Sequence, residues 1–280
     1  MIRINKIVYV VIGFMFLVGS ESLFVFQNIQ AQQGGRLNRI IGQVETGNTA
    51  FVNIDWAWIE MELNPYDIRT LQSRLAELKQ GNSIPFPTPV LRIPMDGDTD
   101  SRWVIKQVLN LGVFNIVVPQ VESGEQALKI VKSMRYPPQK GSKYPEPRGI
   151  RSYGPGRAAR YWGISGDDYM EKADLWPLNP KGELLAIMMI ETKVGVDNIE
   201  DILSVPGVGA ILLGPFDLGM SLGVGTPNPT MPLETEEAIQ IVRRACEVQD
   251  KVICGIAGVY QADRDKRIAE GFRLIQVIGD

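Results

Sequence analysis

The chain has 280 residues, of which 45% are hydrophobic and 22% charged, and its formal net charge is −3. This balance is typical of a globular domain that buries a large core. The slight negative charge gives no electrostatic reason to expect nucleic acid as the main partner. Because histidine is absent, Ser-His-Asp triads, Cys-His dyads and HExxH zinc sites are excluded, and proton transfer must use carboxylates, Lys, Tyr or bound water.

The N-terminal residues have the pattern of an export signal. Two cations precede an apolar run from Ile7 to Gly19, and Ala31 ends a plausible cleavage site. We therefore expect a signal peptide over residues 1–31 and a mature domain over residues 32–280, exported to the periplasm or secreted. The alternative is an uncleaved membrane anchor, because the apolar stretch that continues to Phe26 is long enough to span a bilayer.

Apolar strand-like runs alternate with amphipathic helical segments along most of the chain. The strand-like runs are 49–54, 56–61, 90–94, 114–119, 184–190, 210–213, 252–256 and 272–278. The helical segments are 37–44, 66–78, 102–111, 124–134, 197–203, 234–248 and 263–270. This alternation predicts a parallel sheet that is buried on both faces. Up to eight strands, in a chain of this length, indicate an α/β fold of the (β/α)8 TIM-type barrel class.

Two features predict that this barrel is incomplete. Only Asp55 separates the first two strand-like runs, whereas a parallel crossover needs a dozen residues or more. Residues 49–61 are therefore either one strand or the place where a strand and a helix are missing. The sequence also stops at Asp280, directly after the last strand, without an eighth helix. We expect a barrel that is open or completed by another subunit.

The segment 136–182 is predicted to be one long irregular loop with seven prolines. Loops of this length in compact domains are usually lids or binding arms. Its side chains are expected to shape a mouth for acidic substrates or a subunit contact, and the alternative is a solvated loop. The residues concerned are Arg148, Arg151, Arg157, Arg160, Tyr153, Tyr161 and Trp162.

The two cysteines are expected to be buried thiols. Cys246 falls on a predicted helix and Cys254 on a predicted core strand. An oxidising compartment would allow them to pair, but buried free cysteines are common in such positions.

Two carboxylates follow neighbouring strands of the predicted barrel. Glu191 comes directly after the run 184–190, and Asp217 lies just beyond 210–213. Both are expected at the rim formed by the carboxyl ends of the strands, where barrel active sites lie. They suit Mg²⁺ or Mn²⁺, which take oxygen ligands and leave positions for substrate and water, whereas zinc prefers His or Cys. The alternative is a solvated strand-end Glu and an Asp that caps a helix.

Several segments, in the right order between Asp55 and Asp280, resemble the HpcH/HpaI aldolase/citrate lyase family. The segments that resemble its metal-binding half are Ile190-Glu191-Thr192, Val196-Asp197-Asn198-Ile199, Pro206-Gly207-Val208-Gly209 and Gly214-Pro215-Phe216-Asp217-Leu218. Those that resemble its arm and its early strand are Arg135-Tyr136-Pro137-Pro138, Arg148-Gly149, Arg160-Tyr161-Trp162-Gly163 and Trp56-Ala57-Trp58-Ile59-Glu60-Met61-Glu62. The resemblance implies a metal-dependent (class II) pyruvate aldolase with a TIM-type barrel.

The resemblance also implies a reaction and its ligands. The reaction is reversible aldol cleavage of a 4-hydroxy-2-oxo acid into pyruvate, or a related 2-oxo acid, and an aldehyde. A divalent metal ion, Mg²⁺ or Mn²⁺ with Co²⁺ as a further candidate, would be held by Glu191 and Asp217 and would stabilise the enolate as a Lewis acid. The expected partners are these small molecules and further copies of the chain in a homo-oligomer.

Arg92 matches the arginine with which this family steadies the enolate oxygen. An arginine inside an apolar strand is costly unless it meets an anion, and the alternative is a structural ion pair. The backbone amides of Gly214, Pro215 and Phe216 match the part of the family that receives the substrate carboxylate. Pro215 lacks an N–H, which leaves fewer donors there.

Leu63 departs from the family pattern. Family members read Glu-His-Gly or Glu-His-Asn-Pro where this chain reads Glu62-Leu63-Asn64-Pro65. Leucine cannot move a proton, and a general base typically contributes a factor of about 10²–10⁴ in rate. Glu62, together with Glu60, is a candidate substitute, and the alternative is that both carboxylates are ion-paired.

Two functions therefore remain open. One is a metal-dependent carbon–carbon lyase, and the other is a catalytically impaired relative that binds a metal, a 2-oxo acid or a partner subunit without turnover. A Schiff-base aldolase fits less well, because neither Lys193 nor Lys251 lies within an apolar strand, where the pKa of an amine would fall.

Overall fold

A computed structural model describes residues 35–48, 51–52, 56–79, 87–94, 102–228 and 230–279. The predicted export signal lies outside these residues. The chain divides into two compact units, from Met1 to Asn48 and from Thr49 to Asp280. Among the helices that the structure describes, none combines the length and the apolar character needed to cross a bilayer.

The first unit contains the helix α2 (Arg39–Glu45). The side chain of Asn38 caps it by accepting a hydrogen bond from the backbone N–H of Ile40 at 3.1 Å. Arg36 and Glu45 form an ion pair across it, with Arg36 Nε donating to Glu45 Oε2 at 2.8 Å. The weak helical pattern of residues 37–44 predicted this helix correctly.

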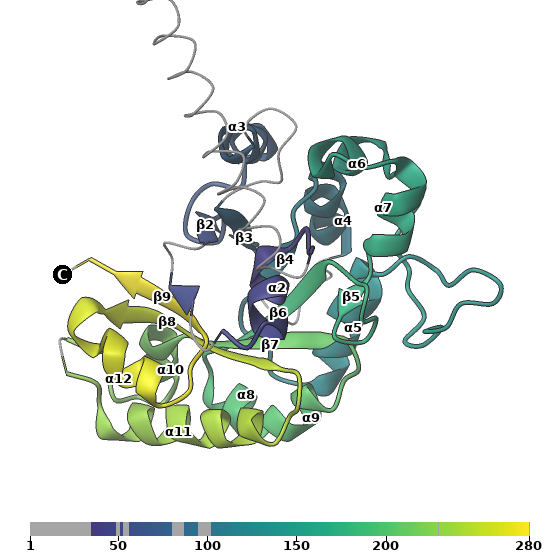
Figure 1. The fold of residues 1–280 in the computed structure, drawn as a ribbon. Coiled ribbons are helices and arrows are strands. Elements are labelled where there is room, and N and C mark those ends of the chain that lie inside the picture. The colour runs from purple at the N-terminus through teal and green to yellow at the C-terminus, as the bar shows by residue number, and fades with distance from the viewer. Residues whose placement is uncertain are drawn as a thin grey trace, which may run out of the picture. The chain divides into compact units, whose positions relative to one another are not determined.

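The second unit is built on a parallel sheet (Figure 1). Within the described residues it has nine strands, hydrogen-bonded in the order β1-β9-β8-β7-β6-β4-β3-β2, with β5 added beside β6. Five of the strands are buried along their whole length, so the predicted parallel sheet with two covered faces is confirmed. The strands are β1 (Phe51–Val52), β2 (Trp56–Glu60), β3 (Thr88–Arg92), β4 (Asn115–Val118), β5 (Leu175–Trp176), β6 (Leu184–Ile190), β7 (Val208–Leu213), β8 (Ile253–Tyr260) and β9 (Leu274–Ile278).

Strands β1 and β2 lie at opposite ends of this order, although only residues 53–55 separate them in the chain. The four residue steps from Val52 to Trp56 can span at most about 14 Å. The two ends of the sheet are therefore held close together, which requires the sheet to curl, as in a TIM-type barrel. Residues 49–61, predicted as one strand or as the place of a missing unit, carry two short strands with different neighbours. An incomplete barrel without a last helix stays a prediction.

Helices cover the outer side of this sheet. Figure 1 shows α8, α9 and α11 along the same side of β6, β7 and β8, and α11 packs against α8, α9 and β8. The predictions for 102–111 and 124–134 are confirmed residue for residue. The helices are α3 (Ile68–Leu78), α4 (Arg102–Leu111), α5 (Gly124–Met134), α8 (Lys193–Asp197), α9 (Ile199–Leu203), α10 (Pro215–Ser221), α11 (Leu233–Glu247) and α12 (Arg264–Ala269), with the 3-10 turn η1 (Gln261–Asp263). Cys246 of α11 and Cys254 of β8 are free and buried, as predicted.

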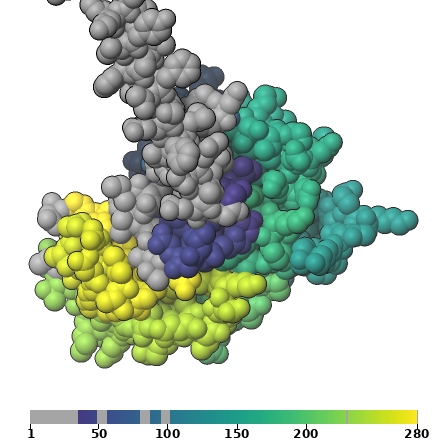
Figure 2. All heavy atoms as spheres, in the orientation of Figure 1, coloured from purple at the N-terminus to yellow at the C-terminus, as the bar shows by residue number. Residues whose placement is uncertain are grey.

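The segment 136–182 is not one irregular loop. It contains α6 (Gly156–Trp162), α7 (Gly166–Lys172) and the strand β5. Gly163 ends α6 with a φ of +73°, and Ser165 caps α7. Trp162 is buried and stacks on Phe114 with 4.4 Å between ring centroids, so a fully solvated loop is wrong. The part that precedes α6 extends outward in Figure 2.

The helices α11 and α12 are joined by a bidentate ion pair. Glu236 accepts hydrogen bonds from Arg267 Nη1 at 2.8 Å and Nη2 at 2.7 Å. The Arg267 side chain is only 3% exposed and also contacts Glu270. The hydrogen bonds from Arg267 lower the pKa of Glu236 to about 2.

This ion pair predicts a defined acid dependence of stability. Because the folded pKa of Glu236 lies below its ordinary value of 4.5, the stabilisation is complete above that value and disappears as the pH falls toward about 2. Glu236→Gln is expected to lower the free energy of unfolding by about 1–3 kcal/mol at neutral pH. The free energy of unfolding of this variant should also change less with pH between about 2 and 4.5. Urea unfolding at several pH values measures it. Glu125→Gln, at the exposed pair with Lys129, is the control and should change stability by less than about 0.5 kcal/mol. Equal effects of the two substitutions would contradict the prediction.

Candidate functional site

Glu191 follows β6 directly, and its side chain is buried, with a residue exposure of 1%. Its Oε1 accepts a hydrogen bond from the backbone N–H of Gln120 at 2.9 Å. Gln120 holds a φ of +52°, an uncommon conformation for a residue other than glycine. Glu191 Oε2 has no hydrogen-bond partner within the described part of the chain. A buried carboxylate oxygen without a donor is costly, so this position suits a positively charged ligand.

The surroundings of Glu191 are acidic. Burial, followed by the charges of Glu62 and Asp217, raises the pKa of Glu191 to about 7, against the opposing effects of the Gln120 N–H and of Arg92. The charges of Glu62 and Asp217, which follow separate strands, both act on Glu191. Their mutual repulsion is a second reason why a cation would be favourable here.

Gly214 makes room for the Glu191 carboxylate. It caps α10, directly after β7, and its N–H donates to the carbonyl of Ile190 at 3.0 Å. A Cβ atom at position 214 would lie 2.6 Å from Glu191 Oε2 and 2.8 Å from Met189 Cε. A side chain at position 214 would therefore require the Glu191 carboxylate and Met189 to move. Asp217 lies in the first turn of α10 and is exposed. Because α10 directly follows β7, Asp217 comes after the carboxyl end of β7, just as Glu191 comes after the carboxyl end of β6.

The predicted amide site for a substrate carboxylate is reduced. The Gly214 N–H already donates to Ile190, and Pro215 has no N–H. Of the three predicted positions, only Phe216 retains a first-turn amide without an intrahelical acceptor. The role that the structure gives to Gly214 is steric.

Arg92 ends β3, where two glutamates hold its guanidinium. Its Nε donates to Glu60 Oε2 at 2.9 Å, and Nη2 lies 2.6 Å from the same oxygen. Its Nη1 lies 2.7 Å from Glu62 Oε2 and contacts Met189 Sδ at 3.8 Å. Burial alone would lower the pKa of Arg92, but these carboxylates and Glu191 raise it on balance. The cation is thus fixed beside the carboxylates, while its charge is shared with Glu60 and Glu62.

Glu60, at the end of β2, organises the turn that follows. Its Oε1 accepts hydrogen bonds from the backbone N–H groups of Glu62 at 2.7 Å and Leu63 at 3.3 Å. Burial would raise the pKa of Glu60, but the hydrogen bonds from Arg92 and Glu62 outweigh it and lower the pKa. Leu63 itself is 79% exposed. It therefore presents an apolar side chain to solvent next to the Arg92 cluster.

The donor set fits a divalent ion that carries its own water. Within the described residues, no group of three or more His, Cys, Asp or Glu side chains is arranged to hold a metal. Glu191 and Asp217 are two oxygen donors, one with an unpartnered buried oxygen. Mg²⁺ is commonly held by one or two carboxylates, with water and substrate oxygens in the remaining positions. This arrangement suits Mg²⁺ or Mn²⁺ and disfavours zinc.

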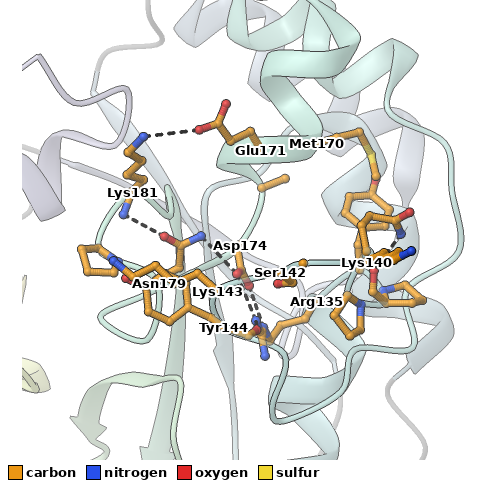
Figure 3. A pocket seen from close by; sticks show the side chains of 17 residues that line it. Arg135, Lys140, Ser142, Lys143, Tyr144, Met170, Glu171, Asp174, Asn179 and Lys181 are labelled. Atoms are coloured by element: carbon orange, nitrogen blue, oxygen red, sulfur yellow. Dashed lines mark hydrogen bonds and ion pairs between the residues drawn. The ribbon is translucent and has the colours of Figure 1, made fainter.

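A cavity of about 790 Å³ lies elsewhere, at the segment 136–182 (Figure 3). At its base, Arg135 Nε donates to Asp174 Oδ1 at 2.6 Å, and the other Arg135 nitrogens donate to the carbonyls of Tyr144 and Pro147. These groups satisfy one another. The segment joins the sheet through β5, at the amino end of β6, whereas Glu191 follows its carboxyl end. This cavity is therefore separate from the carboxylate site.

The curled parallel sheet, with carboxylates at the carboxyl ends of its strands, is consistent with a fold of the TIM-type barrel class. The sequence matches the HpcH/HpaI aldolase/citrate lyase family over residues 44–278. The chain belongs to this family.

Similar proteins carry aldolase names. The hydroxypyruvate/pyruvate aldolase of Roseobacter denitrificans is 37% identical over 63% of this chain and 59% of its own length. The 5-keto-4-deoxy-D-glucarate aldolase of Salmonella newport is 29% identical over 90% of this chain and 87% of its own length. The crystal structure of a family member from Burkholderia cenocepacia J2315 superposes with a TM-score of 0.65, at 29% identity, over 80% of this chain and 78% of that chain.

The contact between Gly214 and Glu191 predicts a sensitive position. Gly214→Ala is expected to displace the Glu191 carboxylate and to lower the free energy of unfolding by about 1–3 kcal/mol, because the new methyl group overpacks a buried site. Gly156→Ala is the matched control, since its Cβ meets only Arg160 Nη1 at an ordinary 3.7 Å, and it should be neutral or slightly stabilising. Chemical denaturation measures both. A Gly214→Ala variant as stable as the control would mean that Glu191 is not held as described.

Proposed function

We propose that the chain is a divalent-metal-dependent carbon–carbon lyase that cleaves or forms 4-hydroxy-2-oxo acids through a pyruvate enolate. The observation that carries this proposal is the buried, unpartnered Oε2 of Glu191, against Gly214 and within the electrostatic influence of Asp217. The aldolase names of the relatives support the reaction class.

In this proposal Glu191 and Asp217 would hold the metal ion. When bound, Mg²⁺, Mn²⁺ or Co²⁺ supplies Lewis acidity to the carboxylate and keto oxygens of the 2-oxo acid. The buried carboxylate of Glu191 fixes one side of the site, since the Gln120 N–H orients it. Asp217 is exposed, so in this proposal it would leave the site open to substrate and water.

Arg92 would stabilise the enolate oxygen. Glu60 and Glu62 engage its Nε and one hydrogen on each terminal nitrogen, so the guanidinium cannot rotate freely. Among the described residues, one Nη2 hydrogen has no acceptor and remains for a substrate oxygen. A fixed donor needs no reorganisation when charge develops, which is the condition for electrostatic catalysis. The free first-turn amide of Phe216 would receive the substrate carboxylate.

Proton transfer is the weak step of the proposed site. Leu63 has no titratable group, so Glu62 or a bound water must exchange the proton. Glu62 is constrained by its ion pair with Arg92. We therefore expect turnover to be slower by a factor of about 10²–10⁴ than with a histidine at this position.

The proposal predicts metal-dependent exchange of pyruvate methyl protons with D₂O. Mn²⁺ or Mg²⁺ should support the exchange and a chelator should abolish it, because the enolate forms only beside the ion. Glu191→Gln and Asp217→Asn should each remove most of the exchange, as followed by proton NMR. Asp265→Asn is the control, since Asp265 forms an exposed ion pair with Arg264. Exchange that persists in the chelator, or in both variants, would disprove the proposed metal chemistry.

The position of Leu63 predicts a gain of function. Leu63→His is expected to raise the exchange rate by about 10²–10⁴, because it restores a general base beside the Arg92 cluster. The pH profile of the gain should follow histidine ionisation, with the neutral base active above a pKa of about 6.5. Leu63→Gln is the control for polarity without basicity. A gain of equal size in the two variants would show that proton transfer is not the limiting step.

A catalytically impaired binding protein is the second candidate function, favoured by the exposed Leu63. In that case calorimetry would detect binding of Mn²⁺ and pyruvate, while exchange would be absent in the wild type and in Leu63→His. Binding with exchange supports the lyase, and the two candidates are thereby separated.

A further inference from the structure

Cys246 and Cys254 form a buried pair of thiols that the proposed reaction does not use. Cys246 lies in the last turn of α11 and is 3% exposed, and Cys254 is the second residue of β8 and is 7% exposed. The chain contains no other cysteine. Glu191 follows the carboxyl end of the parallel strand β6, whereas Cys254 lies at the amino end of β8. The thiol pair is therefore separate from the carboxylate site.

The two thiols are in direct contact. The hydrogen bond between them, followed by burial and the charge of a Cys246 thiolate, raises the pKa of Cys254 well above its usual range. A thiol with a raised pKa keeps its proton, so Cys254 is the donor in this hydrogen bond and the Cys246 sulfur is the acceptor. Adjacent sulfur atoms are the first requirement for a disulfide bond.

The backbone holds both cysteines in place. The carbonyl of Cys246 accepts a hydrogen bond from the N–H of Gln249 at 2.9 Å, at the end of α11. The carbonyl of Cys254 accepts one from the N–H of Arg273 at 2.8 Å, and Cys254 is paired with Ile211 of β7 in the sheet. Because α11 packs against β8, the fold itself brings the two thiols together.

Both cysteines line a cavity of about 400 Å³. Its other walls come from the end of α11 and the turn that follows, from the end of α12 and from the start of β9. Arg243, in this wall, opposes the rise in the pKa of Cys254, and Glu247 adds to it. A water molecule takes about 30 Å³, so a molecule little larger than water has room beside the two cysteines.

We propose that Cys246 and Cys254 are a redox-active pair that a hydroperoxide, such as hydrogen peroxide, converts into a disulfide. The Cys246 thiolate attacks one peroxide oxygen, the O–O bond breaks, and the departing hydroxide takes up the proton released by Cys246. The Cys254 sulfur then attacks the sulfenic acid formed on Cys246. The S–O bond breaks, and the second hydroxide leaves as water with the proton of Cys254. Each sulfur loses one electron, and the peroxide is reduced to two molecules of water.

The disulfide would join the end of α11 to the start of β8 across the short loop 247–253. It would stabilise the folded protein mainly by restricting the unfolded chain. Because a short loop limits this gain, the melting temperature is expected to rise by roughly 5 °C on oxidation.

Treatment of the purified protein with hydrogen peroxide tests the proposal. After denaturation, the number of thiols that react with a thiol reagent should fall from two to none, and dithiothreitol should restore both. Peptide mapping by mass spectrometry should find one disulfide, between Cys246 and Cys254 of the same chain. The melting temperature should rise with oxidation and return on reduction. Thiols that stay reduced, disulfides between chains, or oxidation to sulfinic acid without a disulfide would overturn the proposal.

Variants test the order of the two steps and separate the disulfide from other oxidation. Cys254→Ser should retain a sulfenic acid on Cys246 that dimedone labels, whereas Cys246→Ser should show little labelling. Equal labelling of the two variants would overturn the assigned order. The double variant Cys246→Ala/Cys254→Ala is the control for oxidation of the ten methionines. Peroxide should not raise its melting temperature, and a rise as large as that of the wild type would overturn the proposed stabilisation. If these variants do not fold, the peptide map of the wild type alone decides.

Discussion

The candidate site depends on one buried carboxylate with an unsatisfied oxygen. Glu191 is held from one side by the N–H of Gln120, and the missing side chain of Gly214 gives it space on the other. Neighbouring acids repel it, and burial penalises its charge. A cation at this site would stabilise the charged form of the buried carboxylate, whose burial and acidic neighbours disfavour it.

The second constraint is the balance of charge around Arg92. Its guanidinium compensates Glu60 and Glu62, so little of its charge is left for Glu191. The cluster is therefore rigid and negative rather than neutral. In the proposed function, such a rim would favour a divalent ion and substrates that arrive with that ion. The exposed Leu63 beside it contributes neither charge nor proton transfer, so the binding equipment and the proton-transfer equipment of this site are separable.

Sequence reasoning located the carboxyl ends of β6 and β7 correctly, because buried parallel strands are continuous apolar runs with visible limits, but it ended β8 four residues too early. It placed Glu191 and Asp217 at one rim for this reason. It missed α10, although a proline at the first helical position, here Pro215, is a known start signal. It also missed α6 and α7, whose boundary is marked by Gly163 and Ser165.

Other features had no local signal. The burial of Arg151 could not be predicted from its residue type, because arginine is seldom fully buried. The residues next to it in the sequence also give no sign that it packs against Tyr136 and Tyr169. The positive φ of Gln120 was equally invisible, since it follows from the position of Glu191 and not from a turn sequence. Both depend on tertiary contacts, which a single sequence does not reveal.

The register of β1 has a consequence for how the chain reaches this fold. Phe51 pairs with Leu274, so this hydrogen-bonded contact joins residues 274 − 51 = 223 positions apart. Contacts of such separation form late, because the entropy of closing a long loop must be overcome before they contribute stability. During synthesis β1 emerges long before β9, and it must wait without its partner while the remaining strands assemble. An unpaired strand edge can pair incorrectly during that interval. The unpaired β1 is therefore a segment that a chaperone would need to shield from incorrect pairing.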